Sequence, residues 1–469
     1  MIAQAWKYHK LPILLSLLSF VLYWFFAYQL ERSNFLVLLG LYAGLFGLFY
    51  SIVQKGKTDF WLLGGIAVIA RLIFLPVIPN LSQDFYRFIW DGRLFLQGMN
   101  PYLYTPESFI STGQTTIVAQ AQELYEGMGG LNASHFTNYP PVNQLCFVIA
   151  ALFAGKSITG AAMVFRILIL IADVGTLIVG KKLLQRMGLP IHHIFWYVLN
   201  PFIIIEMTGN LHFESFMLFF VVWALYLLHK GKWFWSAVLV GVSISVKLLP
   251  LLLLPLFFQW FMGAIHFEKV RFRESASSLF KNTKRLVLFY LVVLGTVALT
   301  FAPFLTGEFA QNFGASIALW FQKFEFNASI YYLIRWYGYQ TIGWNIIADV
   351  GPKLPIVVLG IILLITFLRK NHTMIAMITA MMFSIATYFL LSTTVHPWYV
   401  ATPLILCVFT RYRFPLVWSF TIILSYSAYG ANGFQENLGM VALEYGIVIG
   451  YFIWEVFFAT RKKALLTSR

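Results

Sequence analysis

A short polar stretch near the start of the chain combines carboxylates and a guanidinium group at helical spacing. Asp84, Arg87 and Asp91 lie three and four residues apart, so a helix would place them on one face. They follow an apolar segment directly, and partial loss of water there raises the pKa of a carboxyl group. Asp84 is therefore a candidate general base, oriented by a neighbouring Arg. The spacing fits an ordinary amphipathic helix with internal ion pairs equally well.

A second polar group ends a later apolar segment and contains Glu206, Asn210, His212 and Glu214. Carboxylates and histidines at a membrane are costly, and they usually face a polar cavity. His212 and Glu214 could bind a metal ion, but their spacing indicates no third ligand, and we expect no metal site. The alternative is a solvated turn in which Asn210 caps a helix.

Three further places offer cations, rings or amides. Lys247 lies among apolar residues just before Pro250. Its ammonium group could simply reach the membrane surface. We favour a role in neutralising a lipid-linked phosphate, because the proline interrupts the helix there. His396-Pro397 precedes Trp398 and Tyr399, which offers a titratable donor or a sugar-stacking platform where an aromatic belt is the ordinary interpretation. Asn327 and Arg335 belong to another polar interval.

The elements that position these residues are predicted to be membrane helices. The chain has 469 residues, of which 60% are hydrophobic and 11% charged, and its mean hydropathy is +0.76. These values exclude an ordinary soluble globular protein, and an aromatic content of 18% excludes disorder. The apolar residues form blocks of roughly 17–22 residues, each long enough to cross about 30 Å of hydrocarbon. We expect an all-α integral membrane protein.

The distribution of basic residues predicts the topology. The net charge is +15, and most Lys and Arg fall in segments that alternate to one side of the membrane. They include Lys7 and Lys10, Lys55 and Lys57, Lys181, Lys182 and Arg186, Lys230 and Lys232, residues 269–285, Arg369 and Lys370, Arg411 and Arg413, and residues 461–469. By the positive-inside rule both termini are cytoplasmic, and this pattern does not indicate nucleic-acid binding. The two cysteines, both in apolar stretches, predict no disulfide framework.

These signals predict one polytopic domain over residues 1–469 with about 14 transmembrane helices. The main extracytoplasmic loop covers residues 80–141, a basic cytoplasmic loop covers 265–285 and a second extracytoplasmic loop covers 305–340. Residues 142–154 are interpreted as a re-entrant or interfacial helix, because a full span there would invert the charge pattern downstream. All the polar groups above then lie on the extracytoplasmic side.

In combination, the motifs resemble those of bacterial integral-membrane mannosyltransferases, GT-C-fold glycosyltransferases that use polyprenyl-phosphate sugars. The resemblance covers roughly residues 60–410. Its motifs run from Ser82 through Arg93 to Asn100-Pro101-Tyr102, then Tyr139-Pro140-Pro141, Asn200-Pro201 to His212, and Val395 to Tyr399. The family often has Asp two residues after the histidine, where this chain has Glu214.

The resemblance implies a GT-C-like fold with a catalytic first extracytoplasmic loop, and a mechanism. Asp84 would deprotonate an acceptor hydroxyl, which attacks the anomeric carbon of a hexose, mannose by resemblance, with inversion. Cations would bind the departing lipid phosphate: Lys247, Arg87, Arg335 and His396. The other candidates for substrate binding are Asp91, Arg93, Asn100, Tyr102, Glu206, Asn210, His212, Glu214, Asn327, Trp398 and Tyr399.

No cofactor is expected besides the lipid-linked donor, and the scheme requires no divalent metal. The expected partners are the polyprenyl-phosphate sugar, membrane lipids and a glycan, glycolipid or protein acceptor. The expected location is the bacterial inner membrane.

A multi-pass transporter or flippase is the alternative, with Arg166, Asp173, Glu206 and Lys247 along a pathway. A transporter needs a polar site at mid-membrane, whereas these candidates gather in the outer loops. A lipid-linked glycan ligase or polymerase shares the topology, but not the combination of Asp84 with His396-Pro397-Trp398-Tyr399.

Overall fold

The computed structural model describes residues 2–263, 276–431 and 433–459. Residues 265–275 of the predicted basic loop 265–285 therefore lie outside the described residues, and so does the basic stretch 461–469. Nearly all described secondary structure is helical; the strands β1 (Tyr429–Gly430) and β2 (Gly433–Phe434) form one short antiparallel pair. The predicted all-α class is confirmed.

Seven helices among the described residues are long and apolar enough to cross a membrane. They belong to α1 (Ile2–Tyr28), α2 (Phe35–Gly56), α8 (Ile158–Arg186), α14 (Ala276–Phe301) with η4 (Ala302–Phe304), α17 (Ile347–Val350) to α18 (Leu354–Leu368) through η5 (Gly351–Lys353), α19 (Met374–Leu391), and α22 (Leu438–Ile453) with η8 (Trp454–Ala459). The chain is thus a multi-pass membrane protein.

One further apolar helix pair is sharply bent, a geometry shared by broken spans and re-entrant loops. It consists of α10 (Pro201–Ile203) and the π-helical turn η2 (Ile204–Gly209), followed after a bend of 117° by α11 (Glu214–His229). Asn200 caps its start by accepting a hydrogen bond from the backbone N–H of Phe202. The bend contains Leu211, whose φ of 65° lies in the left-handed region that a leucine rarely adopts.

Shorter apolar helices complete the membrane part: α3 (Phe60–Leu72), α7 (Pro141–Ala154), α12 (Trp233–Val246), η3 (Leu249–Phe257) with α13 (Phe258–Met262), η6 (Pro397–Val400) with α20 (Ala401–Val408), and α21 (Phe414–Thr421) with η7 (Ile422–Ala428). The short η1 (Ile191–Ile194) and α9 (Phe195–Val198) precede α10. The count of about 14 spans stays a prediction, since these helices are shorter than a straight crossing requires.

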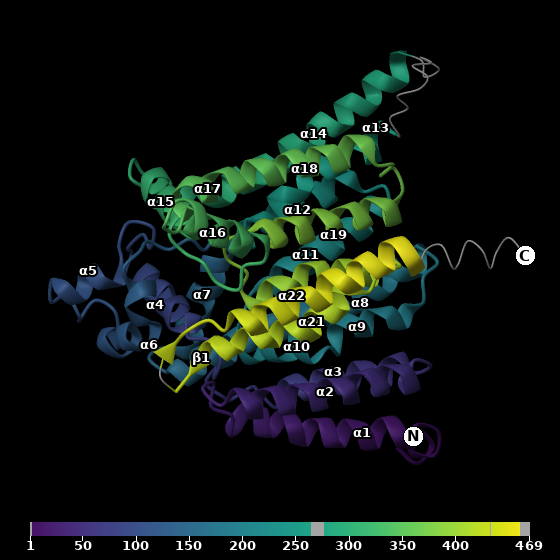
Figure 1. Ribbon diagram of the computed structural model, residues 1–469, viewed down its shortest axis with the longest axis horizontal. Helices are drawn as coiled ribbons and strands as arrows, with labels where there is room; N and C mark the ends of the chain where they lie inside the picture. The colour runs from purple at the N-terminus through teal and green to yellow at the C-terminus, as the bar shows by residue number, and fades with distance from the viewer. Residues whose placement is uncertain (1, 264–275, 432, 460–469) are drawn as a thin grey trace, which may run out of the picture.

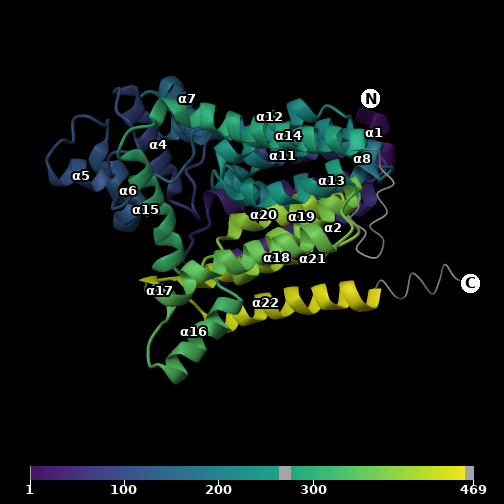
Figure 2. The ribbon, with the colours of Figure 1, turned by 90° about the horizontal axis from the view of Figure 1, so that it is seen from above.

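The polar loops fold into helices at one end of the bundle. These are α4 (Asp84–Leu96), α5 (Pro106–Ser111), α6 (Ala121–Ala133), α15 (Phe309–Gln322) and α16 (Ile330–Thr341). α1 begins and α22 ends at the opposite end of the bundle (Figure 1). Figure 2 shows α15 extending from the side of α4 and α6 towards α17. The two long polar intervals of the sequence therefore meet at the same end.

Two buried contacts fix the elements below this end. Arg71 of α3 pairs with Asp173 of α8 at 2.8 Å, with both side chains 1% exposed. α7 lies against α4 and α8, and the rings of Phe88 and Phe147 stack at 4.6 Å. Gly92 allows this approach of α4 to α7, because a Cβ there would collide with the carbonyl group of Phe147.

Gly92→Ala is therefore expected to lower stability by about 1–3 kcal/mol, the usual cost of overpacking a close contact. The midpoint of thermal unfolding in detergent, followed by tryptophan fluorescence, measures the effect. Gly47→Ala is the matched control, because Gly47 of α2 has open space around its Cβ position. Equal midpoints for the two variants would contradict the proposed close packing.

Candidate active site

A cavity of about 1000 Å³ opens at the loop-bearing end of the bundle. Its walls come from segments far apart in the sequence, including residues 81–84, 128–132, 247–249, 396–399 and 429–430. Seven predicted site residues line it: Asp84, His212, Glu214, Lys247, His396, Trp398 and Tyr399. We call this cavity the cleft.

Asp84 is the first residue of α4 and is only partly buried. Its backbone N–H donates to Ser82 Oγ at 3.3 Å. Burial raises the pKa of its carboxyl group to about 6, against the lowering effect of Lys247 and Arg32, while the carboxylate of Glu214 adds to the rise. A carboxylate with this pKa accepts a proton near neutral pH, as the prediction of a general base requires.

Lys247 and Glu214 form a pair in the cleft wall. Lys247 lies where α12 has ended and the backbone is extended, with φ −148° and ψ 142°. Its Nζ donates to Glu214 Oε1 at 2.5 Å, and its side chain is 20% exposed whereas that of Glu214 is 2% exposed. Glu214 therefore compensates the ammonium charge from behind and leaves part of the group accessible from the cleft.

Trp398 lies between two histidines. Its ring stacks on His212 at 3.6 Å between centroids and on His396 at 4.5 Å, with interplanar angles of 18° and 4°. The predicted sugar-stacking platform is revised accordingly, because parallel imidazoles occupy ring faces of Trp398.

The charge expected on His396 is also revised. Burial, reinforced by the charge of Lys247, lowers the pKa of His396 to about 3. The imidazole is therefore neutral at physiological pH in this structure and offers a hydrogen-bond donor and an acceptor, and its binding of phosphate stays a prediction.

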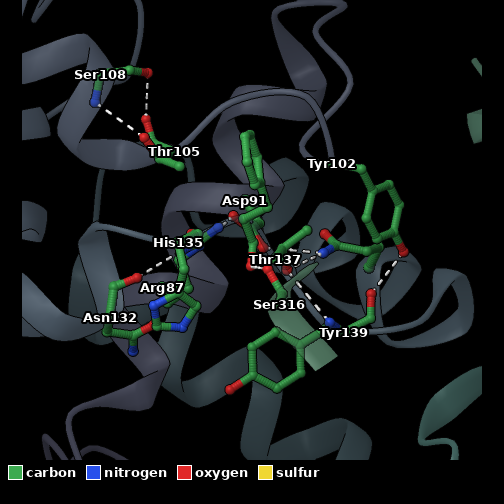
Figure 3. Close-up of polar contacts among 12 residues, drawn as sticks. Arg87, Asp91, Tyr102, Thr105, Ser108, Asn132, His135, Thr137, Tyr139 and Ser316 are labelled. Atoms are coloured by element: carbon green, nitrogen blue, oxygen red, sulfur yellow. Dashed lines mark hydrogen bonds and ion pairs between the residues drawn. The ribbon is translucent and has the colours of Figure 1, made fainter. Parts of the chain in front are cut away.

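Arg87 and Asp91 lie beneath the cleft rather than in its lining. They form the i,i+4 ion pair that the spacing allows, at 2.8 Å and with both side chains 1% exposed. Arg87 also donates to the carbonyls of Asn132 and His135, and Gln144 donates to Asp91, which fixes the segment after α6 (Figure 3). The expectation that Arg87 binds the phosphate is revised to a structural role.

Arg93, Asn100 and Tyr102 also hold the outer helices together. Arg93 donates to the carbonyl of Ala119 at 2.6 Å, and Asn100 to that of Phe304 at 3.1 Å. The Tyr102 hydroxyl donates to the carbonyl of Tyr139 at 2.7 Å (Figure 3). None of the three lines the cleft, although Tyr139 itself does.

Glu206 and Asn210 lie behind the cleft at the bent helix pair. Tyr426 donates to Glu206 Oε1 at 2.7 Å, and Asn210 Nδ2 donates to Glu206 Oε2 at 3.4 Å. Asn210 Oδ1 accepts the backbone N–H of Leu81 at 3.2 Å, three residues before Asp84. These contacts position the backbone around the cleft.

Asn327 and Arg335 lie outside the cleft lining as well. Asn327 donates to both carboxylate oxygens of Glu444 at 3.3 Å. Arg335 pairs with Glu325, and its guanidinium carbon lies 4.1 Å from the ring centroid of Tyr332. The expectation that Arg335 binds the departing phosphate is revised, since Arg335 is absent from the lining of the cleft.

Arg32 is a cleft residue that the sequence reasoning missed. It donates to the carbonyl of Leu81 at 3.1 Å and to the Gln83 side chain, and its guanidinium lies 4.2 Å from the ring centroid of Tyr429. A signal was present: Arg32 follows the first apolar block, on the side where the charge rule makes cations scarce. Among the described residues, no three His, Cys, Asp or Glu side chains are placed to hold a metal ion.

Comparison with known proteins gives one family. The family model described as "Alpha-(1->6)-mannopyranosyltransferase, N-terminal domain" matches residues 21–264, just over half of the chain. This match includes Asp84, His212, Glu214 and Lys247, and it confirms the resemblance to bacterial mannosyltransferases drawn from the motifs.

Two relatives carry the name alpha-(1->6)-mannopyranosyltransferase A. The protein of Mycobacterium tuberculosis is 22% identical over 355 residues, which cover 75% of this chain and 66% of the relative. That of Corynebacterium glutamicum is 28% identical over 209 residues, which cover 43% of this chain and 38% of the relative. The chain thus spans slightly less than two thirds of the first relative and less of the second. No solved structure matches it at comparable significance.

The charges around Asp84 predict how it titrates. Dicyclohexylcarbodiimide attacks protonated carboxyl groups, so labelling of Asp84, quantified by mass spectrometry, should fall as the pH rises, with a midpoint of about 6. In Lys247→Met the midpoint should move upward, because the positive charge that stabilises the carboxylate is lost.

Lys232→Met is the matched control, since Lys232 is exposed in the turn between α11 and α12, at the far end of α11 from Glu214. A midpoint that is the same in the wild type and in Lys247→Met would exclude the described electrostatic contact.

Proposed function

Because the chain belongs to the family of the alpha-(1->6)-mannopyranosyltransferase N-terminal domain, we propose that it is a membrane glycosyltransferase. It transfers mannose from a polyprenyl-phosphate carrier to an acceptor hydroxyl, with inversion at the anomeric carbon. The observation that carries the proposal is that Asp84 and the Lys247–Glu214 pair face the same cleft.

Asp84 takes the role of general base. The pKa of about 6 leaves it mostly ionised at neutral pH, so it can accept the proton of an acceptor hydroxyl as the oxygen attacks. Among the described residues, the carboxylates in the cleft lining are Asp84 and Glu214, and Lys247 already binds Glu214. One available carboxylate suits a single displacement with inversion, in which the C–O bond to the lipid phosphate breaks as the new glycosidic bond forms.

Lys247 takes the role of the cation for the departing phosphate. Phosphate is already a good leaving group, so a positive charge suffices and neither protonation nor a metal ion is required. A positive charge fixed in the cleft wall before reaction stabilises the developing negative charge without reorganisation.

The lining of the cleft supports a lipid-borne donor. Next to Lys247 it is apolar, with Leu248, Leu249, Leu252, Val358 and Phe389. This composition suits an isoprenoid chain beside a polar head group. The charge rule favours an extracytoplasmic cleft with both termini cytoplasmic. The bacterial relatives favour a bacterial inner membrane. A lipid carrier is then needed, because nucleotide sugars are cytoplasmic.

The transporter alternative is less well supported. Arg166, Asp173 and Glu206, which would line a pathway, are each buried and bound to other protein groups, and they are absent from the lining of the cleft. A pathway lined by them would require these contacts to break.

Asp84→Asn is expected to lose nearly all turnover while folding normally, because an amide cannot accept the acceptor's proton. Release of labelled mannose from polyprenyl-phosphate-mannose to a mannoside acceptor measures it. Glu107→Gln is the control, since Glu107 is exposed on α5 and outside the cleft lining. Wild-type turnover in Asp84→Asn would remove this residue as the base.

Lys247→Met is expected to lower kcat by about 100-fold or more, the usual effect of removing one group that stabilises charge in a transition state. Steady-state kinetics with the lipid donor provide the measurement. Lys323→Met is the matched control, because Lys323 is exposed at the end of α15. A kcat within about threefold of the wild type would argue against phosphate binding by Lys247.

A further inference from the structure

Arg166 lies in the first third of α8, is 1% exposed and donates to backbone oxygens of two other segments. Nε and Nη2 donate to the carbonyls of Thr208 and Gly209 at 3.0 and 2.9 Å. Nη1 donates to the carbonyl of Leu75 at 3.0 Å and also to that of Val77. No carboxylate among the described residues forms an ion pair with it.

One of these segments is the end of a helix, η2, and the other is the turn that follows α3. α3 ends at Leu72 and is followed by turns up to Val77, and η2 ends at Gly209 before the bend to α11. The last carbonyls of a helix have no partner within it and carry partial negative charge. Buried backbone carbonyls need a partner inside the protein, so a buried guanidinium with several donors suits both the end of η2 and the turn after α3.

The two segments that Arg166 binds lead directly to the groups in the cleft. From Val77 the chain runs seven residues to Asp84, and from Gly209 it runs five residues to Glu214, the partner of Lys247. The segments also touch, because a Cβ built on Gly209 would lie 3.1 Å from the ring of Phe74. Asn210 adds a second link through the backbone N–H of Leu81.

We propose that Arg166 is a positioning residue: by binding the end of η2 and the turn after α3 at once, its guanidinium sets the place of Asp84 relative to the Lys247–Glu214 pair. Asp84 itself contacts the substrate, and Arg166 acts only through the backbone of the two segments. The catalytic part of this inference rests on the function proposed above, whereas the geometric part does not.

Arg166→Lys tests the inference, since an ammonium group keeps the charge but lacks the planar fork that reaches both segments. We expect kcat to fall by about 100-fold, the effect of a misplacement of about 1 Å, with little change in the KM for the donor. The acid limb of the pH–kcat profile should move to higher pH, because Asp84 then lies farther from the charge of Lys247. Global destabilisation alone would reduce the amount of active protein and leave that limb in place.

The charged and titratable groups that face Asp84 also influence its pKa, and therefore the acid limb of the pH–kcat profile. Besides Lys247 they are the guanidinium of Arg32, the carboxylate of Glu214 and the hydroxyl groups of Tyr139, Tyr399 and Tyr429. Burial raises the pKa of Tyr139 and Tyr429.

Arg413→Lys is the matched control. Arg413 Nη1 donates to the carbonyls of Cys407 and Thr410 at 3.1 and 3.0 Å, so it also binds backbone oxygens where a helix, α20, ends. That end of α20 is remote from His396, which precedes its start at the cleft. The control variant should keep the wild-type kcat and acid limb.

Carbodiimide labelling of Asp84 separates failure of this inference from failure of the proposed function. The labelling midpoint should rise in Arg166→Lys and stay at the wild-type value in Arg413→Lys, whether or not the protein transfers mannose. If Arg166→Lys does not fold, Asn210→Ala should raise the midpoint in the same direction. A wild-type midpoint in each folded variant of Arg166 and Asn210 overturns the positioning role, whereas loss of mannose transfer in the wild type overturns only the proposed function.

Discussion

Glu214 allows a cation and an available carboxylate to share one cleft. A direct pair between Lys247 and Asp84 would stabilise the carboxylate and lower its pKa, which would weaken it as a base. Glu214 instead accepts the hydrogen bond of Lys247, so the ammonium group acts on Asp84 only through space. The pKa of Asp84 can therefore stay near 6 while a positive charge remains available to a departing phosphate. The contacts behind the cleft hold Asp84, Glu214 and Lys247 in place.

They are held by helix ends rather than by helix interiors. Asp84 starts α4, Glu214 starts α11, and Lys247 follows the end of α12. Interrupted helices bring side chains into a cleft at membrane depth, but they leave backbone groups without partners, which the protein must satisfy internally. Arg166, Asn210 and Asn80 do so; Asn80 donates to the carbonyls of Phe26 and Leu30 at the end of α1. The polar groups behind the cleft thus follow from the broken helices in front of it.

The sequence predicted the membrane helices well because apolar length depends on local composition alone. It also predicted seven residues of the cleft lining, since their motifs lie at the ends of apolar blocks. The sequence could not show whether Arg87 forms a structural ion pair or binds substrate, because both roles fit the same i,i+4 spacing. The same holds for Trp398, whose stacking on His212 joins segments nearly 200 residues apart.

Arg32 and Tyr429 illustrate the contacts that spacing could not predict. They meet at the rim of the cleft although nearly 400 residues separate them, and only the folded bundle brings the first outer loop beside η7 and β1. The contact joins a residue inside the family match, Arg32, to one outside it, Tyr429, because the match ends at residue 264. Lys247 and Asp84 lie within the match, whereas His396, Trp398 and Tyr429 lie beyond it and complete the opposite wall. The proposed base and the proposed cation therefore both lie in the part of the chain that the family model matches, and the rings of His396, Trp398 and Tyr429 lie outside it. Neutral imidazole and aromatic groups leave the balance of charge between Asp84, Glu214 and Lys247 undisturbed.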